Sequence, residues 1–426
     1  MKLSSIYKNK SGEMYIEDVS SMELAERFGT PLYVYSEGRI RDNYRRLYDA
    51  ISSNYERTKI HFSAKSNTNL SVLRILCSEG ACLDAVSVGE VYLALKAGFS
   101  PERILFTGTN VRDRDLDYLV ESGVNLNVDS LSMLNRLLEY TTPKLLSVRV
   151  NPGTGAGHHK HVITGGKDSK FGIWEKDLTH AYGRALDAGV ERFGIHMHIG
   201  SGILEPEPHY HATVVLLDMV RKLRESLGIN FEFIDIGGGI GVPYRPDETK
   251  MDLAEFSDKV VTLFREKVEE YGLGHPYLYM EPGRYVVSDA GIILTRVNTV
   301  KTTPHKKFVG VDAGFNVLAR PAMYDSYHHM LLANRMDSPA EELYDVTGPL
   351  CESGDFLAKD RRLPAVKEGD LLAVLNAGAY GFVMASNYNS TSKPPEVLVR
   401  GDRWAETRAG EGMDDLSRGQ NIPQWL

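Results

Sequence analysis

The segments Lys59-Ile-His-Phe-Ser-Ala-Lys65 and Leu70-Ser-Val-Leu-Arg-Ile-Leu76 together contain the pattern that decides the fold. The first is a short run of β-branched and aromatic residues, which is typical of a buried strand. The second has apolar residues at helical spacing, which is typical of a helix that covers such a strand. The pattern recurs up to about residue 285 and predicts eight strands, at 59–64, 82–86, 103–107, 124–128, 145–150, 193–198, 231–236 and 277–281.

Eight strand–helix units of this length predict a (β/α)8 barrel, the TIM barrel. An open, doubly wound parallel sheet is the main alternative. That fold gives no reason for eight strands of similar weight, so the barrel is the preferred interpretation.

The two ends of the chain have a different pattern. Strand-like runs separated by turn residues occur at 14–19, 31–36, 292–299, 307–312, 370–375 and 396–399. Helical periodicity is visible there only at 39–48 and near 324–332. We therefore expect an α/β protein of two domains. A barrel would occupy residues 35–285, and the N-terminal segment 1–34 would complete a β-domain formed by residues 286–426.

The composition fits a soluble enzyme with a large core. The 426 residues are 42% hydrophobic and 25% charged, and the formal net charge of −8 argues against nucleic acid or an anionic membrane as partner. The start of the chain has no apolar signal-peptide core, and no apolar run reaches the roughly 18 residues of a membrane span. The cysteines Cys77, Cys82 and Cys351 form neither a disulfide framework nor a zinc pattern. A cytoplasmic location is therefore expected.

Lys65 comes directly after the first predicted strand of the barrel. In a barrel the chemistry takes place at the C-terminal ends of the strands. A lysine held there loses solvent, which lowers its pKa and frees the amine to form a Schiff base. An isolated lysine at a strand end would more often extend to water, so this interpretation depends on the residues at the ends of the other strands.

Polar and glycine residues lie at the ends of five other predicted strands. They are Asp84 with Ser87, Arg149 with Asn151, His198 with Ser201, the run Gly237-Gly-Gly-Ile-Gly241, and Glu281-Pro-Gly-Arg284. Each pair or run has an ordinary structural explanation taken singly. Their shared position at strand ends favours a common site.

Several of these residues fit pyridoxal 5′-phosphate (PLP). The glycine run lets backbone N–H groups approach a phosphate, although a tight turn would use the same residues. Ser201 could donate a hydroxyl to that phosphate. His198 is either an ordinary buried histidine or a side chain that lies flat against a planar ring.

Glu281 and Arg284 complete the predicted cofactor site. A carboxylate beside a pyridine nitrogen keeps that nitrogen protonated, so the ring can accept the electrons of a carbanion. An arginine binds a carboxylate or a phosphate with two hydrogen bonds. A simple surface pair is the alternative, but Pro282 and Gly283 between the two residues make a regular helical pairing unfavourable.

No metal site is predicted. His158-His159-Lys160-His161 has several imidazoles, but no Asp, Glu or Cys set at ligand spacing completes a site. The long glycine-rich loop around them, Asn151–Gly172, is expected to be a mobile lid near the active site.

The motifs Phe62-Ser-Ala-Lys65-Ser-Asn, His196-Met-His198-Ile-Gly-Ser201, Gly237-Gly-Gly239 and Glu281-Pro-Gly-Arg284 resemble those of the PLP-dependent decarboxylases of the alanine racemase fold type. Within that group, Gly348-Pro-Leu-Cys351-Glu352-Ser353-Gly354-Asp355 is similar to the signature of the diaminopimelate decarboxylase family. Asp312-Ala-Gly-Phe-Asn and Arg320-Pro-Ala-Met-Tyr324-Asp are similar to it as well. The resemblance covers roughly residues 30–400.

The resemblance implies a cofactor, a reaction and an assembly. The cofactor would be PLP, and the reaction would convert meso-2,6-diaminopimelate to L-lysine and CO2, the last step of lysine biosynthesis. The enzyme would be a head-to-tail homodimer with its active sites at the subunit interface.

The resemblance also implies a role for each matching residue. Lys65 would carry the cofactor, His198 would stack on its ring, and Glu281 would hold the pyridinium nitrogen. The other cofactor-binding residues would be Asp84, Ser201, Gly238, Gly239, Gly283, Arg284 and Tyr380. The distal end of the substrate would be bound by Arg284, Arg320, Tyr324 and Tyr380. Cys351, as proton donor, and Glu352, as the ligand of the distal amino group, would come from the partner subunit.

Three other activities fit the same fold. A decarboxylase of ornithine, arginine or carboxynorspermidine is the nearest, but Glu352 beside Cys351, together with Arg320, argues against it. Alanine racemase would use a catalytic tyrosine opposite the lysine and lacks Gly-Pro-Leu-Cys-Glu. A non-catalytic PLP carrier would be a bare barrel, whereas about 140 residues come after this one.

Overall fold

A computed structural model describes residues 7–151 and 169–426 of the protein. The chain forms two compact units. The barrel unit comprises Arg41–Pro243 and Thr249–Val286, and the β-unit comprises Met1–Ile40, Tyr244–Glu248 and Val287–Leu426. The expected boundaries at residues 35 and 285 stay a prediction. Of the predicted lid at 151–172, residues 152–168 lie outside the described residues, and these include the histidines at 158–161.

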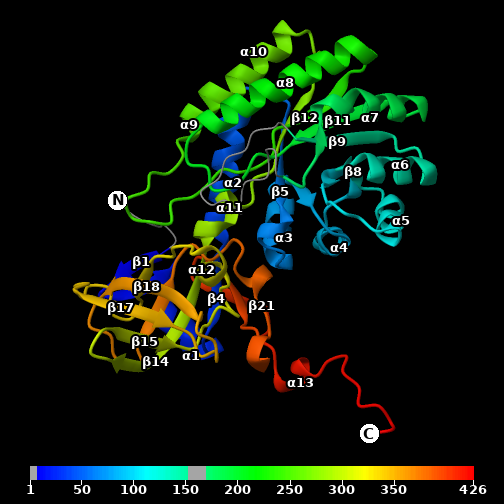
Figure 1. Ribbon diagram of the computed structural model, residues 1–426. Coiled ribbons are helices and arrows are strands. Elements are labelled where there is room, and N and C mark those ends of the chain that lie inside the picture. The colour runs from blue at the N-terminus through cyan, green and yellow to red at the C-terminus, as the bar shows by residue number, and fades with distance from the viewer. Residues whose placement is uncertain (1–6, 152–168) are drawn as a thin grey trace. The chain divides into compact units, whose positions relative to one another are not determined.

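The barrel unit contains a closed sheet of eight parallel strands (Figure 1). Each strand pairs with the next, and the last strand pairs with the first, which closes the ring. The strands are β5 (Thr58–Ser63), β6 (Cys82–Ala85), β7 (Ile104–Phe106), β8 (Asn125–Val128), β9 (Leu145–Asn151), β11 (Arg192–Met197), β12 (Phe231–Asp235) and β13 (Tyr277–Met280). The predicted (β/α)8 barrel is confirmed, and each predicted strand end lies within one residue of the observed one.

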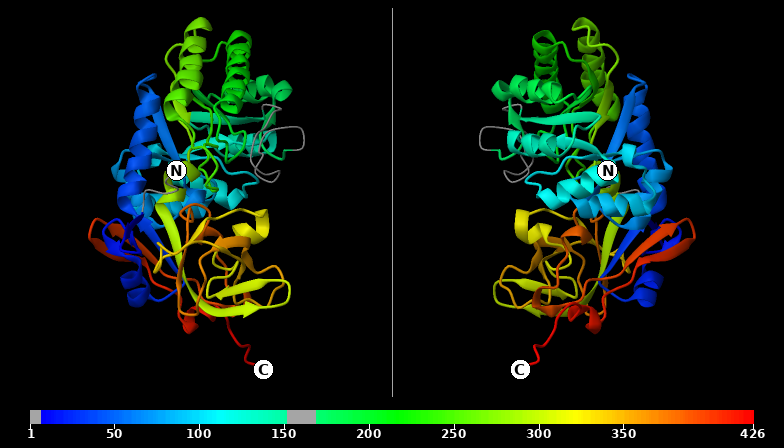
Figure 2. Two further views of the ribbon diagram at one scale, coloured as in Figure 1. Left: turned by 90° about the vertical axis from the view of Figure 1, so that its left-hand side faces the viewer. Right: turned by 90° about the vertical axis from the view of Figure 1, so that its right-hand side faces the viewer.

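Helices alternate with these strands along the chain. They are α2 (Glu37–Ser52), α3 (Leu70–Ser78), α4 (Val88–Ala97), α5 (Asp113–Ser122), α6 (Leu131–Tyr140), α7 (Glu175–Asp187), α8 (Glu207–Leu227), α9 (Leu253–Phe256) and α10 (Thr262–Glu270). Helices α8 and α10 lie side by side on the outside of the barrel in every view (Figures 1 and 2). The short strand β10 (Ile173–Trp174) pairs with β9 and was not predicted. No helix in the described parts of the chain combines the length and the apolarity needed to cross a membrane.

The β-unit is built from both ends of the chain. Its large sheet has the order β18-β17-β15-β14-β4-β20-β21, and β19 pairs with both β14 and β16. The strands are β4 (Leu32–Ser36), β14 (Gly291–Thr302), β15 (Lys307–Val311), β16 (Met330–Leu332), β17 (Glu342–Thr347), β18 (Phe356–Leu363), β19 (Leu371–Val374), β20 (Glu396–Arg400) and β21 (Arg403–Arg408). The N-terminal strand β4 lies between β14 and β20. The predicted completion of the C-terminal sheet by the N-terminal segment is therefore confirmed.

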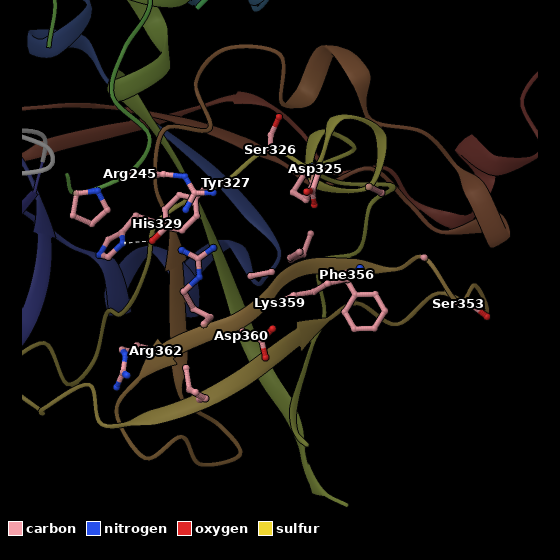
Figure 3. A pocket seen from close by; sticks show the side chains of 18 residues that line it. Arg245, Asp325, Ser326, Tyr327, His329, Ser353, Phe356, Lys359, Asp360 and Arg362 are labelled. Atoms are coloured by element: carbon pink, nitrogen blue, oxygen red, sulfur yellow. Dashed lines mark hydrogen bonds between the residues drawn. The ribbon is translucent and has the colours of Figure 1, made fainter. Parts of the chain in front are cut away.

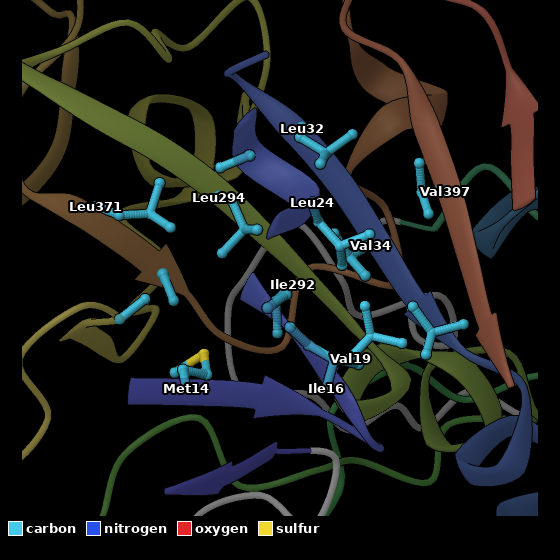
Figure 4. Close-up of a cluster of buried hydrophobic side chains, with 14 of the residues drawn as sticks. Met14, Ile16, Val19, Leu24, Leu32, Val34, Ile292, Leu294, Leu371 and Val397 are labelled. Carbon is cyan, nitrogen blue, oxygen red and sulfur yellow. The ribbon is translucent and has the colours of Figure 1, made fainter. Parts of the chain in front are cut away.

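A smaller sheet of β1 (Tyr7–Lys10), β2 (Glu13–Ile16) and β3 (Val19–Ser20) adds to the same unit. Its inward side chains Met14 and Ile16 are fully buried in a hydrophobic cluster with Leu24, Leu294 and Leu371 (Figure 4). Leu24 belongs to α1 (Ser21–Phe28), a helix that was not predicted. Burial of such side chains contributes about 1.5–3 kcal/mol each, and it fixes the N-terminal segment in this unit.

The expectation of a helix near 324–332 is wrong. The helix α12 (Arg320–Tyr324) ends where Asp325 adopts a left-handed conformation, with φ of 52°. The chain then enters strand β16, which pairs with β19. The helical spacing of apolar residues was misleading here. The segment forms a strand because it pairs with β19, which is distant in the sequence.

Candidate active site

Lys65 and Asp84 form an ion pair at the ends of neighbouring strands. Ser63, the last residue of β5, is aligned with Asp84 in β6, and Lys65 comes two residues after Ser63. Lys65 Nζ donates to Asp84 Oδ2 at 2.8 Å, and Thr107 donates to the other carboxylate oxygen. Burial alone would raise the pKa of Asp84, but the ammonium and these hydrogen bonds lower it to about 2.

The environment of Lys65 differs from the expectation of a desolvated amine. Its side chain keeps 33% of its exposure, and its Nζ lies 2.8 Å from Asp84 Oδ2. Asp84 has no exposed surface. The buried Asp84 carboxylate therefore fixes the position of the Lys65 nitrogen.

Glu281 comes directly after β13 and is 3% exposed. Its Oε2 lies 3.0 Å from His196 Nε2, whereas Oε1 is buried without a hydrogen-bond partner among the described residues. Burial is the main reason that the pKa of Glu281 rises to about 8. A buried acceptor without a partner costs about 1–3 kcal/mol. A donor group brought to Oε1 by a ligand would remove that cost.

His196 connects Glu281 to the barrel interior. Its Nδ1 lies 3.4 Å from Asn127 Nδ2, and both residues are buried. With the amide as donor, Nδ1 accepts and the proton is on Nε2, which then donates to Glu281. Burial lowers the pKa of His196 to about 4, so the ring is neutral at pH 7.

Asp235 is aligned with His196 on the neighbouring strand β12. Its pKa is raised well above the ordinary value, first by burial and then by Glu281. One ligand atom each from His196, Asp235 and Glu281 lies within 4.8 Å of the others. This trio has the residue types of a metal site. Asn127, His196 and Asp235 were not predicted as site residues; the signal for His196 was its place two residues before His198, on the same face of the strand.

His198 contacts the glycine run. Its Nδ1 accepts a hydrogen bond from Gly238 N at 3.1 Å, and burial lowers its pKa well below the ordinary value. A Cβ atom at Gly238 would lie 2.0 Å from the carbonyl oxygen of Glu281. Gly237 and Gly239 have φ of 75° and 111°, which other residues rarely adopt. Glycine is therefore required in this run.

Ser201 and Arg284 meet across the same strand ends. Arg284 Nη2 lies 3.2 Å from Ser201 Oγ, and Arg284 is 5% exposed. Gly283, which precedes Arg284, packs against Ser66, because a Cβ atom there would lie 2.9 Å from Ser66 Oγ. The segments after β5, β11, β12 and β13 thus come together in the barrel unit.

The remaining predicted site residues belong to the β-unit. Arg320 lies on α12 and is 2% exposed; its Nη1 is 3.1 Å from His328 Nε2, and its guanidinium lies 4.8 Å from the centre of the Tyr244 ring. Tyr324 ends the same helix. Cys351 and Glu352 are exposed, and they lie in the loop between β17 and β18. Tyr380 has a left-handed backbone with φ of 56°.

Comparison with known proteins identifies the family. The model of the pyridoxal-binding domain of pyridoxal-dependent decarboxylases matches residues 39–288. The diaminopimelate decarboxylase of Methanothermobacter thermautotrophicus is 54% identical over 98% of each chain, and that of Archaeoglobus fulgidus is 41% identical over 99% of this chain and 100% of its own. The chain belongs to the diaminopimelate decarboxylase family.

The fold also matches a solved member of the diaminopimelate decarboxylase family. The crystal structure of the Methanocaldococcus jannaschii enzyme in complex with L-lysine has a TM-score of 0.93, and the match covers 100% of both chains at 34% identity. The similarity therefore includes both units, not the barrel alone.

Three features of the barrel unit fit the PLP cofactor of the diaminopimelate decarboxylase family. Glu281 Oε1 is buried and has no hydrogen-bond donor among the described residues, so a bound group could donate to it. The glycine run has no room for Cβ atoms, so it presents only backbone atoms to the site. Lys65 presents an amine beside a fixed carboxylate. A ring nitrogen, a phosphate and an aldehyde are the three groups of PLP that match these features.

Proposed function

We propose that the protein decarboxylates meso-2,6-diaminopimelate to L-lysine and CO2 with PLP. The observation that carries this proposal is the buried Glu281 and the Lys65–Asp84 pair in one barrel mouth. The chain around them is 54% identical to a diaminopimelate decarboxylase along nearly its whole length. A decarboxylase of another basic amino acid is less favoured, because Arg320 and Glu352 suit a distal carboxylate and a distal ammonium.

Lys65 would bind the cofactor covalently through Nζ. Asp84 would hold the Lys65 ammonium whenever the amine is free, because their atoms are 2.8 Å apart. Bound PLP supplies a ring that accepts the electron pair left by the departing CO2. Glu281 would accept the N–H of the ring nitrogen at Oε1 and keep that nitrogen protonated. The neutral His198 would lie against the ring without adding a second positive charge.

The phosphate would be bound by Ser201, Gly238, Gly239, Gly283, Arg284 and Tyr380. The contact between Arg284 and Ser201 supports this assignment, because it places a guanidinium and a hydroxyl side by side. Both are donors to a phosphate oxygen.

The distal end of the substrate would be bound by Arg284, Arg320, Tyr324, Glu352 and Tyr380. An arginine fork matches a carboxylate, and Glu352 matches an ammonium. Cys351 would donate the proton to the α-carbon after CO2 has left. Both Cys351 and Glu352 are exposed in their own chain, which supports a homodimer in which each subunit supplies this loop to its partner.

The test is a comparison of substrates on the purified holoenzyme. CO2 release should be measured with meso-diaminopimelate, ornithine, arginine, lysine and carboxynorspermidine, and L-lysine formation with meso-diaminopimelate. We expect kcat/KM for meso-diaminopimelate to exceed the others by about 10⁴-fold, because substrates without the distal carboxylate leave buried arginine donors unpaired. Lys65→Ala is the inactive control. Faster decarboxylation of any other substrate would replace this proposal with the corresponding alternative.

A further inference from the structure

The β-unit contains a hollow of about 820 Å³. Its wall includes residues of β18, the start of α12, residues 325–327 with His329, and Arg245 with Pro246. Figure 3 shows Arg245, Tyr327 and His329 gathered at one side of this hollow. We call it the Tyr327 pocket and define it by Arg245, Tyr327, His329 and Arg361.

Two guanidinium groups lie on the ring of Tyr327. The carbon of the Arg361 guanidinium is 3.7 Å from the ring centre, and that of Arg245 is 4.5 Å from it. The Tyr327 hydroxyl lies 3.2 Å from His329 Nδ1. Two like charges on one aromatic ring repel each other, so the ring alone leaves their charge uncompensated.

Arg361 is the critical group of the Tyr327 pocket. It is 6% exposed, and its Nη1 is buried without a hydrogen-bond partner within the described parts of the chain. No described carboxylate lies within ion-pair distance of the Arg361 or the Arg245 side chain. A buried guanidinium without a counter-charge is strongly destabilising, and an anion at Nη1 would compensate it.

The other charged side chains of the pocket wall do not compensate the two guanidinium groups. Lys359 and Arg362 are cationic, and they match in number the carboxylates Asp325 and Asp360. Asp360 Oδ1 is also 3.4 Å from Lys306 Nζ, so part of its charge is already compensated. Burial lowers the pKa of His329 to about 4, which leaves it neutral at pH 7. The charges of Arg245 and Arg361 are therefore in excess.

We propose that the Tyr327 pocket binds a small oxyanion, a carboxylate or a phosphate. Arg361 Nη1 would donate to one oxygen, and the Arg245 guanidinium would donate to another. Guanidinium groups prefer oxyanions because their N–H groups match the spacing of two oxygens. The proposal uses only residues of the β-unit and does not rest on the proposed decarboxylase function.

The test is thermal unfolding of the PLP-saturated holoenzyme against increasing inorganic phosphate, and separately against malonate. Ionic strength is kept constant with sodium chloride. Saturation of the enzyme with cofactor keeps its own phosphate site filled. The variants are Arg361→Gln and Arg245→Gln. The matched control is Arg403→Gln, which removes the same charge from an exposed position of β21.

We expect a saturable rise in Tm for the wild type and for Arg403→Gln with at least one of the anions. The apparent affinity should fall by about tenfold or more in Arg361→Gln and in Arg245→Gln, the loss of one charge-assisted hydrogen bond. If Arg361→Gln does not fold, the exposed Arg245→Gln carries the comparison. Tighter binding of phosphate than of malonate would assign a phosphate-bearing ligand, and the reverse order would assign a carboxylate.

Two results would overturn the proposal. One is the same anion response in all four proteins, because the anions would then bind elsewhere. The other is no response of the wild type to either anion. If Arg361→Gln then also converted a dimer into monomers, the pocket would hold a carboxylate of a second copy, and it would not be a small-anion site.

Discussion

At the scale of single residues, Glu281 has two different oxygens. Oε2 is hydrogen-bonded to His196, and Oε1 is buried without a hydrogen-bond partner among the described residues. We expect Glu281→Gln to lower kcat by at least about 10²-fold while cofactor content stays near that of the wild type, because an amide cannot keep the ring nitrogen protonated. The measurements are steady-state kinetics and the cofactor-to-protein ratio after gel filtration. A kcat near that of the wild type would remove this role from Glu281.

His196 is a positioning residue for the same carboxylate. In His196→Phe the Glu281 carboxylate loses its buried donor, so we expect kcat to fall by about tenfold to 10²-fold with KM little changed. The pH at which the visible cofactor band changes should also move. His196→Gln, which keeps a donor, should recover part of both properties. If His196→Phe only lowered Tm and left the pH profile unchanged, the histidine would have a structural role alone.

The strand-end residues could be predicted from the sequence, and the Asn127–His196 contact could not. Lys65, Asp84 and Glu281 come directly after or at the end of predicted strands, and a barrel brings such positions together. Asn127 and His196 lie on β8 and β11, which β9 separates in the sheet. Their contact depends on how side chains fill the barrel interior, and no short sequence pattern contains that information.

At the scale of single elements, the first turn of α4 contains a partly buried acid. Glu90 Oε2 accepts from Val86 N at 2.8 Å, and Ser87 Oγ accepts from Glu90 N at 3.2 Å. Burial raises the pKa of Glu90 to about 7, although the hydrogen bond from Val86 opposes the shift. The folded state thus binds a proton that the unfolded state releases, and this contribution to stability declines as pH rises from about 4.5 to 7.

We therefore expect Glu90→Gln to gain stability relative to the wild type as pH rises. The difference in unfolding free energy between the two proteins should change by about 1–2 kcal/mol from pH 5 to pH 8, measured by denaturant titration. Glu139→Gln, on the exposed surface of α6, makes the same change of charge and should show little pH dependence. A Glu90→Gln difference that stayed constant with pH would contradict the raised pKa.

The elements of the β-unit were harder to predict than those of the barrel. All eight barrel strands were predicted because each is a compact apolar run with a helix after it. Strands β1, β16, β17, β18 and β21 were missed, and β18 includes charged residues on its exposed face. Such strands depend on pairing with distant partners, which outweighs local preference.

At the scale of the whole molecule, the proposed homodimer predicts complementation between inactive variants. Lys65 lies in the barrel unit, and Cys351 lies in the β-unit. If each site uses the partner's loop, a mixture of Lys65→Ala and Cys351→Ala subunits contains hybrids with one intact site. Random exchange makes about half of the dimers hybrid, so activity should approach about one quarter of the wild-type value.

A mixture of Lys65→Ala and Glu281→Gln is the matched control, because both changes lie in the barrel unit and no hybrid site is intact. It should stay inactive. Subunit exchange is verified by mass spectrometry in both mixtures. Exchange without recovery in the first mixture would mean that Cys351 serves the Lys65 of its own chain.

The position of β4 in the sheet has a consequence for synthesis of the chain on the ribosome. All five of its residues are buried, and its two neighbours, β14 and β20, come from residues 291–302 and 396–400. The nascent chain therefore carries an apolar strand with both edges open while the whole barrel is being translated. Such a strand is a binding site for chaperones and a starting point for aggregation. Translation that stops before β20 is complete would release a chain with a formed barrel and an unfinished sheet.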